Sequence, residues 1–226
     1  MKISILTLFP EMFQGPFDHS IVKNAKEKKL ISIDLVNIRN FGIGKHKIVD
    51  DKPYGGGHGM ILRVDVLEKT INSARNKNLK SNEEKIILLS PRGKTFNQKK
   101  AIKLSNLKHL ILICGHYEGV DERTKEFIDE ELSIGDFIVT GGEIPAMLIT
   151  DAIVRLISSV LKEGVTADES FSSLLEYPQY TKPNIYKKLN VPEILLSGNH
   201  EKIKEWRNKE SLEITTRLRP DLLKKE

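Results

Sequence analysis

The chain has 226 residues, of which 39% are hydrophobic and 30% are charged, with a net charge of +5 and a pI near 9.1. This length allows one large domain, or one domain with a small appendage, and it is sufficient to bury a substantial core. The single cysteine, Cys114, excludes an internal disulfide and any zinc site built from several cysteines.

The basic excess lies mainly at the C-terminal end, where residues 182 to 226 contain 11 Lys/Arg against 7 Asp/Glu. A mildly basic surface suits a polyanionic partner. No apolar run approaches the roughly 20 residues that cross a bilayer. The first residues, KISILTLF, read as a strand and lack the basic and long apolar regions of a signal peptide. We therefore expect a cytoplasmic protein with no membrane partner.

Strands and helices alternate along the first 160 or so residues. The first part of the pattern predicts a strand at 2–8, a short helix after Pro10, a helix at 20–29 and a strand at 30–36. Next come a helix at 64–78, a strand at 85–89, a helix at 95–104 and a strand at 107–113. The last predicted elements are an acidic helix of about a dozen residues before Gly135, a short strand at 137–139 and a long helix at 143–161. This alternation predicts an α/β fold with a parallel sheet covered by helices on both faces.

In the long helix at 143–161, we expect one face to point inward: Ile144, Met147, Leu148, Ala152, Leu156 and Val160. The apolar pattern then lapses between Gly164 and Ser173, which is typical of a linker. We expect a domain at 1–162, a linker at 163–176 and a small helical domain at 177–226. Asn199 is the predicted N-cap of its main helix, with Ile203 and Trp206 on one face.

Three loops rich in glycine, at 89–93, 115–119 and 133–142, each adjoin an apolar strand. Loops of this kind converge at one edge of a parallel sheet, where the backbone can approach a small ligand. For any single glycine a tight turn is the simpler explanation, whereas the three loops together favour a pocket. GGGHGM, at residues 55–60, lacks the spacing of a dinucleotide-binding fingerprint, and the chain has no P-loop.

Several motifs occur in one order: LFPEMF at 8–13, VDDKPYGGGHGM at 49–60, LSPRGK at 89–94, CGHYEGVDER at 114–123, SIGDFIVTGGEIPAM at 133–147, LLEYPQYTKP at 174–183 and VPEILLSGNH at 191–200. Together they cover nearly the whole chain, and they resemble the bacterial tRNA (guanine-37-N1)-methyltransferases. That family comprises knotted, S-adenosylmethionine-dependent enzymes. The resemblance implies a C-terminal trefoil knot in the sheet domain, a homodimer and tRNA as partner.

The resemblance also assigns the three loops to the cofactor, S-adenosylmethionine. The residues assigned to it are Leu89, Pro91, Gly93, Gly115, Tyr117, Glu118, Gly119, Ser133, Ile134, Gly135, Asp136, Phe137, Ile138, Val139, Gly142 and Pro145. Apolar walls and backbone amides suit its adenine ring. Cys114 ends a predicted buried strand, which favours a small core residue over a nucleophile.

The loop at 50–60 offers Tyr54 and His58 as surfaces for a base, between glycines that make it mobile. By resemblance it closes over the target guanine, through Tyr54, Gly55, Gly56, Gly57, His58, Gly59 and Met60. Composition alone equally allows a disordered surface loop.

Methylation of guanine N1 requires a base for the N1 proton and a cation for charge developing on the guanine oxygen. The resemblance implies an aspartate in the linker and an arginine on the long helix, and the arginine corresponds to Arg155. Family members carry Asp directly before Ser-Phe, whereas here Asp168 and Glu169 precede Ser170 and the segment that follows is one residue shorter. Strict matching selects Glu169. A slip of one residue selects Asp168, which we prefer.

The family requires Mg²⁺, which takes oxygen ligands such as Glu118 and Glu176, but no metal ligand is assigned. The histidines are too scattered for a zinc site. By resemblance, basic residues of the last helices hold tRNA phosphates: Lys202, Lys204, Arg207, Lys209, Arg217 and Arg219. Two alternatives remain, a non-catalytic RNA-binding or ribosome-assembly module and a knotted methyltransferase for another RNA position.

Overall fold

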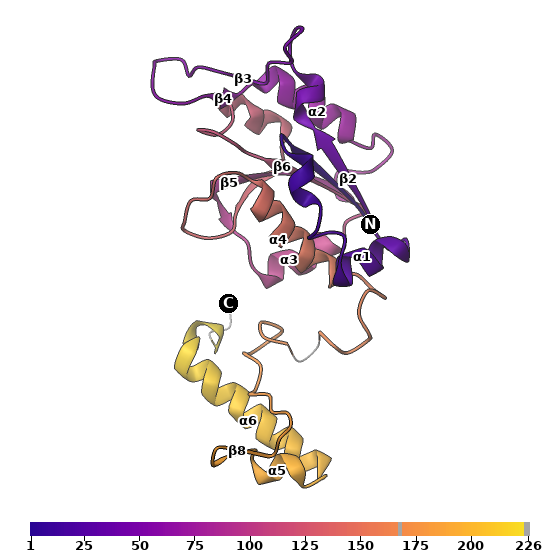
Figure 1. Cartoon of the computed structure of the whole chain (residues 1–226), viewed down its shortest axis with the longest axis vertical. Helices are drawn as coiled ribbons and strands as arrows, with labels where there is room; N and C mark the ends of the chain where they lie inside the picture. Colours follow the sequence, from indigo (N-terminus) through magenta and orange to yellow (C-terminus); the bar gives the residue numbers. More distant parts are fainter. Residues whose placement is uncertain (167–168, 224–226) are drawn as a thin grey trace. The chain divides into compact units, whose positions relative to one another are not determined.

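The computed structural model describes residues 1–166 and 169–223. The chain divides into two compact units, Met1–Leu161 and Lys162–Glu226 (Figure 1). Of the predicted catalytic residues, Asp168 lies outside the described residues. Within the described part of the chain, no helix is both long and apolar enough to span a membrane.

The first unit is built on a five-stranded sheet in which every pair of neighbours is parallel, in the order β2-β1-β6-β5-β7. Its strands are β1 (Lys2–Thr7), β2 (Ser32–Asn37), β5 (Glu84–Thr95), β6 (His109–Cys114) and β7 (Glu130–Ser133). All residues of the central strand β6 are buried, as expected for a strand covered on both faces. The predicted parallel sheet is therefore confirmed.

Helices cover both faces of this sheet, and each face has its own apolar core. One core receives η1 (Pro10–Phe13), α1 (Ser20–Glu27), α3 (Gln98–Ser105) and α4 (Glu143–Val154), and the other receives η2 (Ile38–Phe41) and α2 (Val64–Ala74). Strand β6 supplies Leu110 and Leu112 to the first core and Ile111 and Ile113 to the second. Each such side chain contributes about 1.5–3 kcal/mol by leaving water. A short hairpin, β3 (Asp50–Asp51) and β4 (Ile61–Leu62), stands apart from the sheet.

The acidic helix before Gly135 is shorter than predicted, and the predicted strand at 137–139 is wrong. The chain forms the short helix η3 (Glu122–Phe127) and then β7, while residues 137–139 form a loop. Asp129 directs this course, because its carboxylate accepts the Ile86 N–H at 2.8 Å and its own N–H donates to the Ile86 carbonyl at 2.8 Å. The segment thereby pairs with the otherwise open edge of β5, a long-range contact that local periodicity does not reveal.

Helix α4 ends at Val154 instead of 161, and its inward face differs from the predicted one. Ile144 and Leu148 are 51% and 47% exposed, whereas Ala146, Ile149 and Ile153 are fully buried. Apolar residues occupy both faces of this helix, so the periodicity did not single out the one that packs on the sheet. Helix α3 likewise begins at Gln98, after β5 has continued to Thr95, and Asn97 caps it by accepting the Lys100 N–H at 2.9 Å.

The start of α4 lies against the end of β6, on the backbone itself. The Gly142 N–H donates to the Gly115 carbonyl at 2.8 Å. A Cβ atom at position 142 would lie 2.5 Å from Cα of Cys114 and 2.9 Å from N of Gly115. Since no side chain fits at that distance, glycine at 142 is required for the two segments to meet.

The second unit is built around α6 (His200–Leu218), together with α5 (Glu193–Leu196), η4 (Pro220–Leu223) and a hairpin of β8 (Ile185–Tyr186) and β9 (Leu189–Asn190). The predicted N-cap is confirmed, since the Asn199 side chain accepts the Lys202 N–H at 3.1 Å. Thr215 is fully buried and accepts the Leu175 N–H at 2.9 Å, which fixes the incoming segment on α6. The sequence did not predict the hairpin.

Three polar side chains form a hydrogen-bonded row across the sheet, near the amino ends of β1, β6 and β5. His109 is 1% exposed, and its Nδ1 lies 2.7 Å from Oε2 of Glu84 while its Nε2 lies 2.9 Å from Oγ of Ser4. A neutral imidazole satisfies both contacts by donating to Glu84 and accepting from Ser4. Burial lowers the pKa of His109 and outweighs the opposing effect of Glu84.

We predict that His109 makes the protein less stable under acidic conditions. The unfolded chain takes up a proton near pH 6.5, while the folded protein does so only at lower pH. The free energy of unfolding therefore falls as the pH drops from about 7 to about 5.5. Urea unfolding at several pH values should show a smaller drop for His109→Gln than for the unaltered protein. Identical drops would contradict this assignment.

We also predict that Gly142→Ala destabilises the first unit by about 1–3 kcal/mol, because the new methyl group would displace the backbone at Cys114. Gly115→Ala is the matched control, since its Cβ would meet only the Leu89 carbonyl oxygen, at 3.3 Å. Urea unfolding of both variants measures the difference. Equal midpoints would show that the contact at position 142 does not limit packing.

Candidate active site

A cavity of about 1250 Å³ opens in the first unit where β5, β6 and β7 end. The carboxyl ends of parallel strands are the usual place for a ligand in an open α/β sheet. The walls come from the bulged part of β5, the loop after β6, the loop after β7 and the first turn of α4. The three predicted loops therefore converge on one cavity.

Most of the residues that the sequence assigned to a cofactor line this cavity, namely Leu89, Pro91, Gly115, Tyr117, Glu118, Gly119, Ser133, Ile134, Phe137, Ile138, Val139, Gly142 and Pro145. Three assigned residues do not line it: Gly93, Gly135 and Asp136. A Cβ atom at Gly93 would lie 2.5 Å from the Leu132 nitrogen, so this glycine lets the bulge of β5 approach β7. Gly135 has a φ of +148°, which L side chains rarely adopt.

The loop predicted to close over a base is attached to the cavity at both ends. Tyr54 lines the cavity and is almost fully exposed, while Gly55, Gly56, Gly57, His58, Gly59 and Met60 do not line it. At the other end, the Glu118 N–H donates to the Met60 carbonyl at 3.1 Å. A Cβ atom at Gly59 would lie 2.5 Å from Cγ of Glu118, so the loop rests on that side chain.

Tyr117 connects the loop after β6 to residues outside the three loops. Its φ is +57°, in the left-handed region that non-glycine residues seldom occupy. Its pKa is raised, chiefly by burial and then by a hydrogen bond to Asp50, while the nearby Arg39 opposes the shift. The tyrosine is therefore neutral near pH 7. Its side chain contributes to the cavity wall, while its hydroxyl group is engaged by Asp50 and Arg39, which do not line the cavity.

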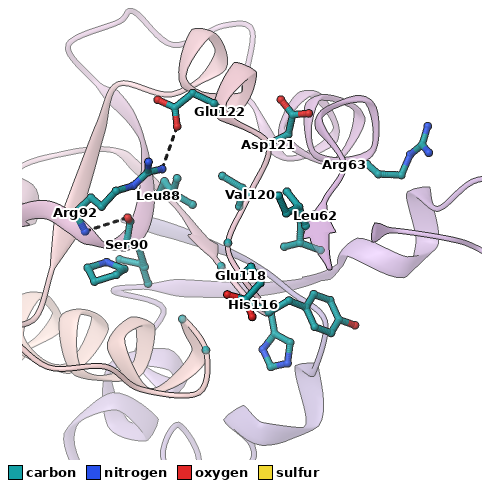
Figure 2. Close-up of a pocket in the computed structure, with 18 of the residues that line it drawn as sticks. Leu62, Arg63, Leu88, Ser90, Arg92, His116, Glu118, Val120, Asp121 and Glu122 are labelled. Carbon is teal, nitrogen blue, oxygen red and sulfur yellow. Dashed lines mark hydrogen bonds and ion pairs between the residues drawn. The ribbon is translucent and has the colours of Figure 1, made fainter. Parts of the chain in front are cut away.

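Charged side chains that the sequence analysis did not single out surround the cavity, and each arginine among them has a carboxylate partner. Figure 2 shows the pair of Arg92 and Glu122. Arg92 pairs with Glu122 at 3.1 Å, Arg63 with Asp65 at 3.0 Å, and Arg123 with Asp121 at 2.7 Å. Their guanidinium groups lower the pKa of Asp65 and Asp121 through these hydrogen bonds. An acid two residues from an arginine, as in RVD and DER, is the sequence signal for the pairs of Arg63 and Arg123. No local spacing signals the pair of Arg92 and Glu122.

His116, Thr140 and Gly141 also line the cavity and were not assigned. His116 stacks edge-on against Phe9 and Tyr117, with ring centroids 5.1 and 4.6 Å apart. The sequence could have indicated His116 as a lining residue, because it lies between two assigned residues, Gly115 and Tyr117. Cys114, directly before this loop, is fully buried, and burial raises the pKa of its thiol well above the ordinary value. This thiol is therefore an inert core group.

Of the predicted catalytic residues, Arg155 belongs to the unit that holds the cavity, and it does not line the cavity. Arg155 follows the last residue of α4 in the first unit, and Glu169 belongs to the second unit. Both take part in polar interactions. Among the residues that the structure describes, no group of three or more His, Cys, Asp or Glu side chains is arranged to hold a metal ion.

Comparison with known proteins identifies the family. A family model described as "tRNA (Guanine-1)-methyltransferase TrmD" matches residues 1–225. The chain is 54% identical to a protein of Dictyoglomus turgidum over 100% of this chain and 91% of the relative, and 55% identical to one of Carboxydothermus hydrogenoformans over 99% and 88%. A protein of Clostridium botulinum strain Kyoto is 53% identical over 100% and 92%. All three are named tRNA (guanine-N(1)-)-methyltransferase. The chain therefore belongs to the tRNA (guanine-N1)-methyltransferase family.

Proposed function

We propose that the protein transfers a methyl group from S-adenosylmethionine to N1 of the guanosine at position 37 of tRNA, next to the anticodon. The observation that carries this proposal is the family match across residues 1–225, which includes every loop around the cavity. The names of the relatives give the reaction class and the atom that is methylated.

The cavity suits S-adenosylmethionine, which supplies an electrophilic methyl group when bound. Its volume of about 1250 Å³ exceeds the usual 300–1,000 Å³ of small-molecule pockets, so room remains for the acceptor base. Leu89, Ile134, Ile138 and Pro145 offer apolar walls for an adenine ring. Gly115 and Gly142 bring backbone close to the ligand, and Ser133 adds a hydroxyl group. The remaining contacts that we propose are the lining residues of the same loops.

The loop from Tyr54 to Met60 is the proposed contact for the target guanine. Tyr54 offers a ring for base stacking, which is worth about 1–3 kcal/mol for each stacked base. The almost complete exposure of its ring supports this role, because an aromatic ring in water gains from burial. The contact of Gly59 with Glu118 places this loop next to the proposed cofactor loops.

Proton removal is assigned to the linker carboxylates and charge stabilisation to Arg155. The carboxylate of Asp168, or alternatively that of Glu169, would accept the N1 proton as N1 takes the methyl group. Bound S-adenosylmethionine would supply that methyl group and keep the electron pair of the broken bond. Arg155 stabilises the negative charge that develops on the guanine oxygen.

The proposed active form is a homodimer whose sheet domain carries a trefoil knot. The exposed Ile144 and Leu148 on α4 support a partner subunit, since a helix that is apolar on both faces favours burial on both. The knot is proposed from the family resemblance. The backbone contact of Gly142 with Cys114 places the chain after β7 directly on the end of β6.

The second unit is the proposed tRNA-binding domain, with residues 163–176 as linker. Its basic side chains differ in the contacts that they make within the protein. Arg207 lies over the Tyr177 ring at 4.7 Å, Arg219 pairs with Asp221 at 2.7 Å, and Lys209 lies 3.7 Å from Glu213. Lys202 and Lys204 are exposed on α6. We propose that these cations, with Arg217, hold phosphates and so position the anticodon stem and loop.

A requirement for Mg²⁺ is part of the family resemblance, but the described side chains do not form a site for it by themselves. Mg²⁺ is often held by one or two carboxylates together with substrate oxygens and water. Glu118 is a carboxylate at the cavity that meets this description. No step of the reaction is assigned to the metal.

We predict that removing the base abolishes methyl transfer without abolishing cofactor binding. Asp168→Asn or Glu169→Gln, whichever removes the base, should lower the turnover rate about 10²–10⁴-fold. Transfer of labelled methyl groups to a tRNA transcript measures the rate, and calorimetry measures S-adenosylmethionine binding. If both variants retain full turnover, the linker does not supply the base.

We further predict that only transcripts with guanosine at position 37 accept label, because the proposed base removes a proton that adenosine lacks at N1. The comparison uses two transcripts that differ in that nucleotide alone. Equal labelling would show that another position is modified. Cofactor binding without labelling of either transcript, in the presence of Mg²⁺, would favour a different RNA substrate, and absence of cofactor binding would favour the RNA-binding module.

A further inference from the structure

A buried polar cluster lies behind the cavity, where three distant segments of the chain meet. Its members are Thr7 at the end of β1, His116 in the loop after β6, and Glu143, the first residue of α4. Glu143 is 2% exposed and Thr7 is fully buried. A buried carboxylate is costly unless its oxygens receive hydrogen bonds, so its partners are informative.

Thr7 fixes one oxygen of this carboxylate. Its hydroxyl group donates to Oε1 of Glu143 at 2.7 Å and accepts the Phe9 N–H at 2.9 Å. The single hydroxyl hydrogen is therefore committed to Glu143. The N-terminus of α4 adds a favourable field for the negative charge.

The second oxygen of Glu143 faces His116 across Gly141. A Cβ atom at position 141 would lie 2.4 Å from Oε2 of Glu143 and 2.7 Å from Nδ1 of His116. Among residues 1–166 and 169–223, this Nδ1 has no hydrogen-bond partner, although it is buried. Nδ1 of His116, which can donate, and Oε2 of Glu143, which accepts, thus border the same small space. A side chain at position 141 would fill that space, and glycine leaves it open.

We propose that His116 and Glu143 are positioning residues for the cofactor. In the cofactor-bound protein, Nδ1–H of His116 donates to Oε2 of Glu143. Because His116 belongs to the loop at 115–119 and Glu143 follows the loop at 133–142, this bond holds two walls of the cavity at a fixed separation. The Gly142–Gly115 backbone bond lies beside it and fixes the same two loops.

Two aromatic contacts hold the ring of His116. Phe9 and Tyr117 contact it edge-on from two sides, and Phe9 also donates its N–H to Thr7. Nδ1 of His116 and Oε2 of Glu143 both lie within 2.7 Å of the same point, the position that a Cβ atom of residue 141 would take. The proposal rests on the proposed function, since it assigns the role of two residues toward S-adenosylmethionine.

The test compares two variants of nearly equal size, His116→Asn and His116→Gln. The amide nitrogen of asparagine stands at the same number of bonds from Cα as Nδ1, so asparagine retains the donor, whereas glutamine moves it one bond further. We expect the dissociation constant of S-adenosylmethionine, measured by calorimetry on the full chain, to rise about tenfold or more for His116→Gln, as for loss of a hydrogen bond to a charged group. His116→Asn should remain within about threefold of the unaltered protein.

Glu143→Gln provides the second arm. Glutamine carries no charge and has a single acceptor oxygen, so the charge-assisted bond is lost and the advantage of asparagine over glutamine at position 116 should shrink in this background. Thermal unfolding of each variant separates a loss of affinity from a loss of folded protein.

The outcomes separate this inference from the proposed function. If the unaltered protein does not bind S-adenosylmethionine, the proposed function fails. If it binds and both His116 variants bind equally, the pair does not position the cofactor and the inference is overturned. The same conclusion follows if the difference between the two variants persists undiminished in Glu143→Gln.

Discussion

The architecture of the cavity depends on one close approach, that of Gly142 to the end of β6. At this point two backbones touch without any side chain between them. The contact sets where α4 begins, and the loops on either side of it form opposite walls of the cavity. The glycines of GGEIP are therefore steric requirements of the fold as well as neighbours of the ligand. Any movement of α4 along the sheet would also change the shape of the cavity.

Much of the fold was predictable because its inner strands β5 and β6 contain apolar runs, and because α6 begins at a recognisable cap, Asn199. Two features were not predictable from local pattern. Strand β7 depends on Asp129 bonding to Ile86, more than 40 residues earlier. The buried face of α4 depends on which of two apolar strips meets the sheet, and this is decided by tertiary packing.

The candidate site divides in the same way. The glycine loops were predictable as a group because strand ends in a parallel sheet share one edge. The separate roles of the glycines were not, since Gly93 allows two strands to approach while Gly142 lines the cavity. The polar cluster of Thr7, Glu143 and His116 was also missed. Thr7 and Glu143 are more than a hundred residues apart in the sequence, so no local spacing connects them.

The arginines around the cavity have a consequence for which molecules the site selects. Arg63, Arg92 and Arg123 each pair with a carboxylate whose side chain is at least partly exposed. Ion pairs of this kind contribute at most about 1 kcal/mol and are screened by salt. These arginines can therefore exchange a carboxylate for a phosphate at little cost in free energy. The ion pairs leave the entrance open to a polyanion.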